Sequence, residues 1–380
     1  MNNDRRLRSR VHRILSNIAF PLLILAAPMS SRAWAQDEQT TVGGYGELHY
    51  NEPDGTGRGQ LDFHRFVLYY AHTFSDRVSF QSELELEHTR IEAGDEDGGE
   101  IAIEQAYLEW RFAGSTGLRA GIVLVPMGII NERHEPATFN GVERPNVDRT
   151  IIPSTWREAG LGLYGKFSDA LSYQAYVVAG LKAEGFSGSG GIRGGRQSGF
   201  RSDPVNPSFA GRLDYLADAS LKLGGSVFAG NTTGGVSSMG SGMLLIVSGD
   251  AEFRQGNFAL RAVGVYGSLG DADKINTAFG RGVADNFYGF YGEGAYDIMP
   301  HIDPLTETSL ILFARYEKYN TQSTVTGFQA NPVNDRDEIT IGATLKPTYN
   351  TAFKVDYQFL NNGADVNTKA LNFGIGYQFN

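Results

Sequence analysis

The chain has 380 residues and a formal net charge of −10, and it contains 48 glycines, 12 % aromatic residues and no cysteine. Glycine weakens helices and aromatic residues favour pleated surfaces, so this composition favours many short strands and argues against a helical bundle. A mean hydropathy of −0.26 and 20 % charged residues exclude a polytopic helical membrane protein and a disordered chain, while the lack of cysteine excludes disulfide scaffolds and thiolate chemistry.

Residues 1–35 have the pattern of a secretory signal peptide. An arginine-rich start is followed by an apolar run over 14–27 and by a small-x-small cleavage pattern at 33–35. The run is too short to span a bilayer, which takes about 20 residues, so we expect cleavage after Ala35 and export of the mature chain. Because residues 1–35 hold six arginines and one aspartate, residues 36–380 carry a formal charge of −15. This acidity argues against nucleic acid as a partner.

The mature chain repeats segments of roughly ten residues in which apolar and polar residues alternate. In 78–87, for example, Glu83, Glu85 and Glu87 share one face and apolar residues occupy the other. A period of two predicts strands whose two faces meet different surroundings. The sixteen predicted strands are 42–50, 61–74, 77–90, 100–112, 116–124, 158–167, 171–181, 208–216, 219–231, 243–254, 257–269, 286–298, 308–320, 337–347, 349–360 and 368–379.

The connections between these predicted strands alternate between long and short. The third long connection, 125–157, has 33 residues, whereas the short connection 75–76 has two. This asymmetry is typical of outer-membrane barrels, which have long external loops and tight periplasmic turns. All prolines after the signal peptide fall in connections or at strand ends, as a closed hydrogen-bonded ladder requires.

We therefore predict an all-β fold: a transmembrane antiparallel β-barrel of about sixteen strands, with long extracellular loops and short periplasmic turns. It forms a single domain over 36–380, and both mature termini lie on the periplasmic side. One short-side connection, 299–307, is longer than this pattern predicts.

The alternation also predicts which strand faces meet lipid and which meet water. The apolar face points to lipid, and the opposite face carries so many charged residues that a dry interior would cost several kcal/mol for each. A barrel of about sixteen strands is wide enough for an aqueous channel, so we expect a wet lumen. The predicted outward-facing residues are Phe80, Leu84, Leu108, Trp110, Leu213, Tyr215, Val355, Tyr357, Phe373, Ile375 and Tyr377.

The connection 125–157 is the main candidate for a constriction of the channel. It contains four prolines and a dense run of charges, and loops of this length are usually functional or disordered. We expect it to fold into the lumen, where opposite charges across a narrow pore sort solutes by charge; the alternative is a solvated external loop. The candidate pore-lining and selectivity residues are Arg65, Glu83, Glu85, Glu87, Glu109, Arg111, Arg119, Arg133, Arg144, Arg149, Arg157, Arg212, Arg254 and Arg315.

Five short motifs follow one another in the first half of the chain, at 105–110, 118–121, 125–128, 143–144 and 153–165. Together they resemble the phosphate-selective porin O and P family of Gram-negative outer membranes. The resemblance implies a sixteen-stranded trimeric porin with inward-folded loops, in which basic residues draw anions through the channel. It places basic residues at Arg119, Arg144 and Arg157, whereas Leu124 stands where the family often has a lysine.

Patterns that would indicate an enzyme or a metal site are weak. The sequence contains no G-x-S-x-G, H-E-x-x-H or Walker motif. The glycine-rich run 188–195 has no helix after it, which favours a flexible linker over a phosphate-binding loop. His64 and His72 share a predicted strand face but lie eight residues apart, too far for one metal ion, and the glutamates of 78–87 favour a pore wall over a Ca²⁺ site. We expect no catalytic residue, no cofactor and no metal.

From these features we predict a porin of the Gram-negative outer membrane that passes small hydrophilic solutes or ions by passive diffusion. A phosphate- or anion-selective channel is the alternative within this class, and an outer-membrane enzyme or adhesin is the alternative outside it. The last predicted strand ends on Phe379, one residue before the end of the sequence, which resembles the C-terminal assembly signal of outer-membrane proteins. The expected partners are small solutes or anions, outer-membrane lipid, the outer-membrane assembly machinery and further copies of the chain in a homotrimer, with no nucleic acid.

Overall fold

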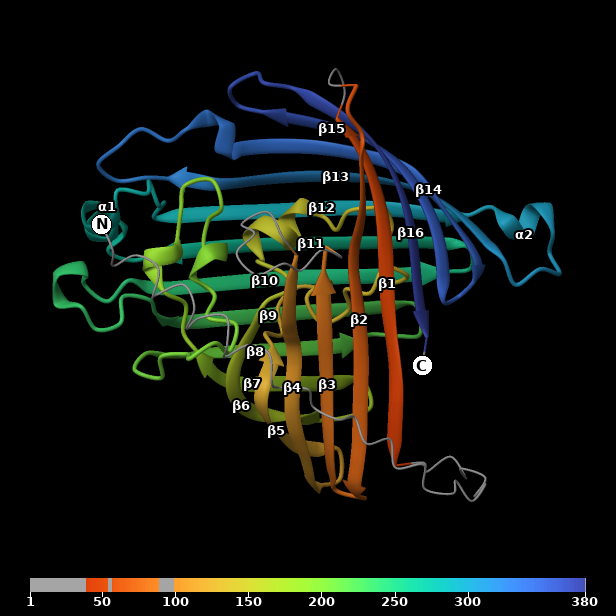
Figure 1. Cartoon of the computed structure of the whole chain (residues 1–380), viewed down its shortest axis with the longest axis horizontal. Coiled ribbons are helices and arrows are strands. Elements are labelled where there is room, and N and C mark those ends of the chain that lie inside the picture. Colours follow the sequence, from red (N-terminus) through yellow and green to blue (C-terminus); the bar gives the residue numbers. More distant parts are fainter. Residues whose placement is uncertain (1–38, 54–56, 89–98, 380) are drawn as a thin grey trace, which may run out of the picture. The chain divides into compact units, whose positions relative to one another are not determined.

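The computed structural model describes residues 39–53, 57–88 and 99–379, so the predicted signal peptide and its cleavage site lie outside the described residues. Sixteen strands form one closed antiparallel barrel, in which each strand pairs with its neighbours in sequence and the first pairs with the last (Figure 1). The strands are β1 (Thr40–Pro53), β2 (Gln60–Ser75), β3 (Val78–Glu87), β4 (Glu100–Ala113), β5 (Thr116–Leu124), β6 (Arg157–Lys166), β7 (Leu171–Ala179), β8 (Pro207–Leu216), β9 (Leu221–Asn231), β10 (Met243–Gln255), β11 (Phe258–Leu269), β12 (Asn286–Asp297), β13 (Ser309–Thr324), β14 (Asp335–Thr348), β15 (Thr351–Asn362) and β16 (Thr368–Phe379).

The barrel confirms the predicted fold class, and each of the sixteen predicted strands corresponds to one observed strand. The bounds differ by a few residues, because the alternation of apolar and polar residues fades toward the strand ends. β13 continues to Thr324, and β14 includes Thr348, so the turn before β15 is formed by residues 349–350.

The antiparallel order places the long connections at one end of the barrel, here called the loop end, and the short ones at the other, the turn end. Both ends of the barrel sequence lie at the turn end, because Thr40 pairs with His72 close to the β2–β3 turn and Phe379 pairs with Gly44. The longer turn-end connection contains the short helix α2 (Met299–Ile302), visible beyond the strands in Figure 1.

The remaining helices are short and lie in the connections. They are the π-turn η1 (Val147–Ile151), α1 (Ala272–Phe279) and the 3-10 turns η2 (Ala183–Gly185), η3 (Arg193–Gly195), η4 (Ser237–Met239) and η5 (Pro332–Asn334). Among the described residues, no helix combines the length and the apolar character that a membrane span requires.

The outer face of the barrel is apolar, as the alternation predicts. Leu108, Trp110 and Leu213 are each 51 % exposed, and most of the other predicted outward residues are similarly accessible. Phe80, Val355, Tyr357 and Tyr377 are half-buried by their neighbours on adjacent strands.

The inner face departs from the prediction at the loop end, where it is apolar as well. On β10, Leu244 and Ile246 point inward and are fully buried, although their neighbours Leu245 and Val247 are exposed on the outside. The inward residues belong to an apolar core that fills this part of the barrel. Its members from the connections include Val125, Met127, Ile130, Ile151, Ile152, Trp156, Leu181, Phe186 and Ile192.

Candidate functional site

The connection between β5 and β6, residues 125–156, lies inside the barrel and is called the first inserted segment below. Its backbone is held by carboxylates of the far wall: the N–H of Val142 donates to Asp356 at 2.6 Å, and the N–H of Val147 donates to Glu317 at 3.0 Å. Charged strand faces supply such acceptors, which is why a polar segment is stable in this position. Its other bonds to the wall include Gln174 to Glu132 (2.9 Å), Asn140 to Glu293 (2.9 Å), Asn146 to Glu338 (2.6 Å) and Lys346 to the Ala137 carbonyl (2.6 Å).

His134 is the main buried attachment of this segment to the wall opposite. Its Nε2 lies 3.3 Å from Glu104 on β4, and Arg65 on β2 donates to its carbonyl oxygen at 2.8 Å. Burial alone disfavours the charged imidazole, but the adjacent Glu104 carboxylate more than compensates and raises the pKa of His134 to about 9. His134 is therefore a charged partner of Glu104 at neutral pH.

Two acids of the first inserted segment, Glu143 and Asp148, have pKa values shifted in opposite directions. Glu143 accepts from the His49 Nδ1 at 3.0 Å; burial opposes its ionisation, but this hydrogen bond lowers the pKa of Glu143 to about 2. Asp148, in η1, is fully buried, and burial raises its pKa to about 7. The first acid is ionised at neutral pH, whereas the second is about half protonated.

The connection between β7 and β8, residues 180–206, is called the second inserted segment and packs against the first. Arg193 donates to the carbonyl of Ser154 at 2.6 Å, and Arg196 donates to that of Thr155 at 2.7 Å. Phe186 and Ile192 are fully buried in the apolar core. The expectation that the glycine-rich run 188–195 is a flexible linker is therefore wrong: its glycines allow close packing, as at Gly185 and Gly194, where an added Cβ would come within 2.2 Å of the other residue's backbone.

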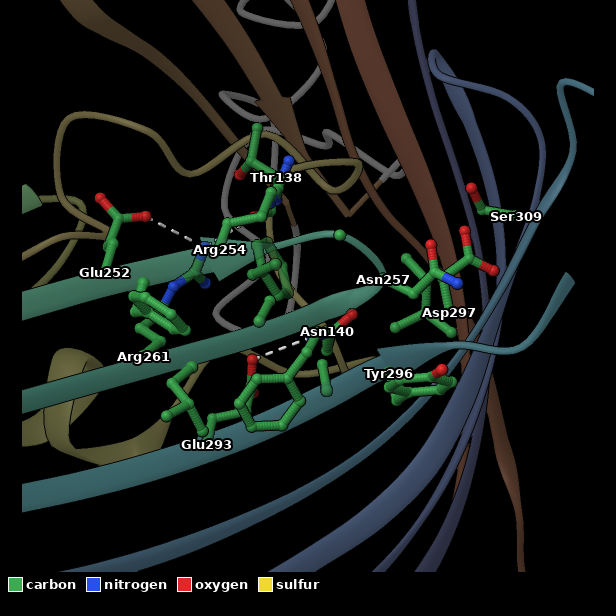
Figure 2. A pocket seen from close by; sticks show the side chains of 18 of the residues that line it. Thr138, Asn140, Glu252, Arg254, Asn257, Arg261, Glu293, Tyr296, Asp297 and Ser309 are labelled. Carbon is green, nitrogen blue, oxygen red and sulfur yellow. Dashed lines mark hydrogen bonds and ion pairs between the residues drawn. The ribbon is translucent and has the colours of Figure 1, made fainter. Parts of the chain in front are cut away.

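Two polar cavities flank the first inserted segment. The loop-side cavity, of about 550 Å³, is lined by β1–β4 and by both inserted segments. The turn-side cavity, of about 560 Å³, is lined by β8–β14 and by residues 133–140 (Figure 2). Phe139 lines both, with the Lys354 ammonium 3.8 Å from its ring centroid. The first inserted segment thus separates two water-accessible spaces.

The loop-side cavity has two walls of different charge. The strand wall, from β1 to β4 and His88, carries Glu47, Asp62, Glu85, Glu87 and Glu100 together with three histidines and Arg65. The segment wall, from the inserted segments and the start of β6, carries one acid, Glu143, and five arginines, Arg144, Arg149, Arg157, Arg193 and Arg196.

None of these five arginines forms an ion pair within the part of the chain that the structure describes. Three of them bind backbone or hydroxyl oxygens instead, and the Nε of Arg157 is buried without a partner. Burial, followed by the nearby Arg196 and Arg149, lowers the pKa of Arg193 to about 9. The segment wall therefore holds excess positive charge.

The positive and negative charges that line the turn-side cavity are more evenly balanced. Arg133 of the first inserted segment pairs with Glu252, and Arg261 lies 3.6 Å from the same carboxylate. Figure 2 shows Glu252 and Arg261 beside each other, with Asn140 reaching Glu293 nearby. Arg254 lines this cavity without an ion pair in the described residues.

The predicted selectivity residues thus fall into three groups. Arg65, Glu85, Glu87, Arg144, Arg149 and Arg157 line the loop-side cavity, and Arg133 and Arg254 line the turn-side cavity. Glu83, Glu109, Arg111, Arg119, Arg212 and Arg315 lie on the barrel wall but line neither cavity. The arginine pairs of the wall are Arg65 with Glu47 (2.5 Å), Arg119 with Glu109 (3.0 Å), Arg111 with Glu109 (3.7 Å), Arg212 with Asp250 (2.7 Å) and Arg315 with Glu317 (2.8 Å).

The sequence reasoning missed Arg193 and Arg196 and the histidines of the strand wall. The two arginines stand in a glycine-rich connection, where nothing in the local pattern indicates that the chain turns inward.

Comparison with known proteins supports the fold more than any particular activity. No family profile matches the sequence, so the resemblance to the phosphate-selective porin O and P family is not confirmed. An uncharacterized protein of Aquifex aeolicus (strain VF5) is 36 % identical over 343 residues, which cover 87 % of this chain and 78 % of that protein.

Solved structures with the same fold are outer-membrane proteins. The outer membrane channel DcaP of Acinetobacter baumannii matches with a TM-score of 0.59 and 11 % identity over 90 % of this chain and 97 % of that one. The anion-selective porin of Comamonas acidovorans matches with 0.58 and 13 %, and OmpT of Vibrio cholerae in its trimer form with 0.56 and 10 %, each over 90 % of this chain and 99 % of that one. At these identities the likeness concerns the fold.

Proposed function

The chain belongs to the family of the Aquifex aeolicus protein, and from its barrel and lumen we propose that it is an outer-membrane porin through which small hydrophilic solutes diffuse passively. A closed barrel with an apolar outer face suits a bilayer, and sixteen strands leave room for an aqueous path. The polar cavities on both sides of the first inserted segment support this path. The porin-type structural neighbours support it as well.

The first inserted segment sets the constriction in this proposal. It lies between the two cavities and binds wall residues on several sides, so a solute that crosses the barrel passes along it. Opposite charges on two sides of the path, as in the loop-side cavity, produce a transverse field that sorts solutes by charge and dipole.

The single observation that supports a charge selectivity is the segment wall, whose five arginines form no ion pairs among the described residues. Of the strand-wall carboxylates, Glu47 pairs with Arg65, Glu85 lies 3.9 Å from the same arginine, and Asp62 is hydrogen-bonded to His64 and His88. The acid of the first inserted segment in this cavity, Glu143, pairs with His49. The loop-side cavity therefore stabilises anions more than cations, although the chain as a whole is acidic. We infer a modest preference for anions, phosphate among them.

The location and assembly follow from the same proposal. The protein is exported through the signal peptide, is inserted by the outer-membrane assembly machinery and contacts outer-membrane lipid through its apolar face. A homotrimer is the expected assembly, supported by the trimer form of the Vibrio cholerae neighbour. The proposal is a channel without an enzymatic role, which the porin-type structural neighbours support.

Planar-bilayer recording of the purified protein in a KCl gradient tests the proposal. We expect open channels, a reversal potential that indicates preference for chloride, and reduced chloride current when phosphate is added. Arg149→Gln and Arg157→Gln test the segment wall, because neither side chain makes a hydrogen bond in the described structure that holds the fold. One charge about 8 Å from an ion in water contributes about 0.5 kcal/mol, so each variant lowers the anion-to-cation permeability ratio about twofold.

Arg111→Gln is the matched control, because Arg111 lies on the wall outside both cavities, beside Glu109. Its permeability ratio stays close to that of the parent protein. Absence of conductance refutes the porin, whereas a cation preference that Arg149→Gln and Arg157→Gln leave unchanged refutes the role of the segment wall.

A further inference from the structure

Asp62, His64 and His88 form a cluster on the strand wall of the loop-side cavity. A β-bulge in β2 brings them together: the pairing of β1 with β2 shifts between Glu47 and His49, so β2 has one extra residue between Asp62 and Arg65. Bulges re-aim side chains and occur next to functional sites. Here the bulge places His64 on the lumen side, as well as the adjacent Arg65.

The same bulge corrects the expectation that His64 and His72 share a face. His72 follows Leu68 and Tyr70 on the exposed outer face of β2, whereas His64 faces the cavity. The second histidine of the cluster comes instead from the end of β3, where the His88 N–H donates to the His64 carbonyl at 2.9 Å.

The three side chains converge on one point. Oδ2 of Asp62 lies 2.7 Å from Nδ1 of His88 and 3.3 Å from Nδ1 of His64. The ligand atoms of all three residues lie within 4.8 Å of one another, and the two imidazole rings meet edge to face with centroids 5.3 Å apart. In tetrahedral zinc coordination, with bonds of about 2.1 Å, ligand atoms are about 3.4 Å apart. Small side-chain rotations therefore bring the three atoms around one ion.

A third histidine beside the cluster fixes the orientation of one ligand. His49 stacks on His64 with a centroid distance of 4.6 Å, and its own ring nitrogens are occupied by Glu47 at 3.2 Å and Glu143 at 3.0 Å. His49 is thus a positioning neighbour of His64 and not a fourth ligand. The unpaired arginines of the cavity belong to the opposite, segment wall.

A second group of possible ligands, Glu83, Glu104 and His134, does not offer a comparable site. His134 and Glu104 are fully buried, and their ion pair fastens the first inserted segment. The cluster on the strand wall is open to the cavity, so an ion and water have access to it.

We propose that Asp62, His64 and His88 bind a divalent transition-metal ion at the wall of the channel. Two imidazole nitrogens and one carboxylate oxygen are ligands that Zn²⁺ and Cu²⁺ prefer, whereas Ca²⁺ and Mg²⁺ prefer oxygen ligands alone. The ion binds Nδ1 of each imidazole in its neutral form with the ring proton on Nε2, and a second proton on either ring is released to water when the ion binds. The remaining coordination position faces the lumen and takes water.

Titration calorimetry of the full-length protein with Zn²⁺ tests the site directly. We expect one Zn²⁺ per chain, and His64→Gln, His88→Gln and Asp62→Asn each weaken binding at least about tenfold. His72→Gln, on the outer face of the same strand, and His301→Gln, at the turn end, bind Zn²⁺ like the parent protein. Single-channel conductance without metal shows that each variant is folded.

Electron paramagnetic resonance with Cu²⁺ supplies a second measurement. Its result would not differ between the parent protein and the variants if the histidines had only a structural role. The proposal predicts hyperfine coupling to two imidazole nitrogens in the parent protein and to one in His64→Gln and in His88→Gln. A parent protein that binds no Zn²⁺, or binding and nitrogen coupling that persist in these two variants, overturns the proposal. Neither result affects the porin function, which is measured as conductance.

Discussion

Arginines paired within the barrel strands and arginines of the segment wall differ in what they bind. On the strands, Arg65, Arg212 and Arg315 each contact a carboxylate of the same or the neighbouring strand at 3.2 Å or less. On the segment wall, Arg144, Arg193 and Arg196 bind hydroxyl or carbonyl oxygens and no carboxylate.

The cause of the difference is geometric. Residues two apart on a strand, and residues opposite each other on paired strands, are neighbours on one face, so an acid and a base placed there neutralise each other. In an irregular segment, many carbonyl groups accept no hydrogen bond from a helix or a sheet. These carbonyl groups accept hydrogen bonds from the arginines of the segment but do not neutralise their charge. The segment wall therefore supplies unbalanced positive charge to the loop-side cavity, and the strands supply the frame that holds the inserted segments.

The largest expected effect comes from removal of the constriction itself. Deletion of residues 132–149 takes away the part of the first inserted segment that separates the two cavities, and we expect single-channel conductance to rise at least about twofold. Deletion of residues 300–306, which belong to a turn-end connection but line neither cavity themselves, is the control and leaves conductance unchanged. Equal conductance of the parent and the 132–149 deletion would contradict the constriction.

A smaller effect is expected from the two acids of the strand wall that have no ion pair in the described residues. Glu87 and Glu100 are opposite each other on β3 and β4 and line the loop-side cavity. Glu87→Gln and Glu100→Gln each remove one negative charge and raise the anion-to-cation permeability ratio, by about twofold at a distance of about 8 Å. The reversal potential in a KCl gradient measures this ratio.

Glu109→Gln serves as the comparison for these two variants, because Glu109 is paired with Arg119 and lines neither cavity. If Glu87→Gln and Glu100→Gln shift the reversal potential no more than Glu109→Gln does, the two walls of the cavity do not differ in the way described.

The smallest expected effect is a pH dependence of the attachment of the first inserted segment. The pKa of His134 is about 9 in the folded protein, above its ordinary value of 6.5. The ion pair with Glu104 therefore stabilises the attachment fully below pH 6.5, and this stabilisation is lost as the pH rises through about 9. We expect the segment to loosen between pH 7 and pH 10.

Acrylamide quenching of Trp156 measures this loosening, since Trp156 belongs to the segment and is fully buried against Phe228. Trp110→Phe removes the signal of the exposed tryptophan on the outer face. Quenching increases with pH in this background and becomes independent of pH in His134→Gln. A pH dependence that persists in His134→Gln assigns the loosening to another group.

The sequence by itself determined the strands and their order. The period-two alternation, as in 78–87, is a local property, and antiparallel neighbours joined by alternating long and short connections leave a single closed barrel as the arrangement in which every backbone group is paired. The outward apolar residues follow from the same alternation, because successive side chains of a strand point to opposite faces of the sheet.

Tertiary structure decided what lies inside the barrel. The position of the first inserted segment depends on Asp356 and Glu317, which lie 214 residues beyond Val142 and 170 residues beyond Val147. The packing of the two inserted segments depends on Arg193, which lies 39 residues beyond Ser154. The sequence of β10 reflects this packing, because residues on both faces of the strand are apolar. The same pattern is typical of any strand buried on both faces, so the sequence alone does not show that inserted segments cover the inner face. The β-bulge before Arg65 brings Asp62, His64 and His88 together. Residue spacing in the sequence does not predict this cluster, because a single extra residue changes which face of the strand a side chain occupies.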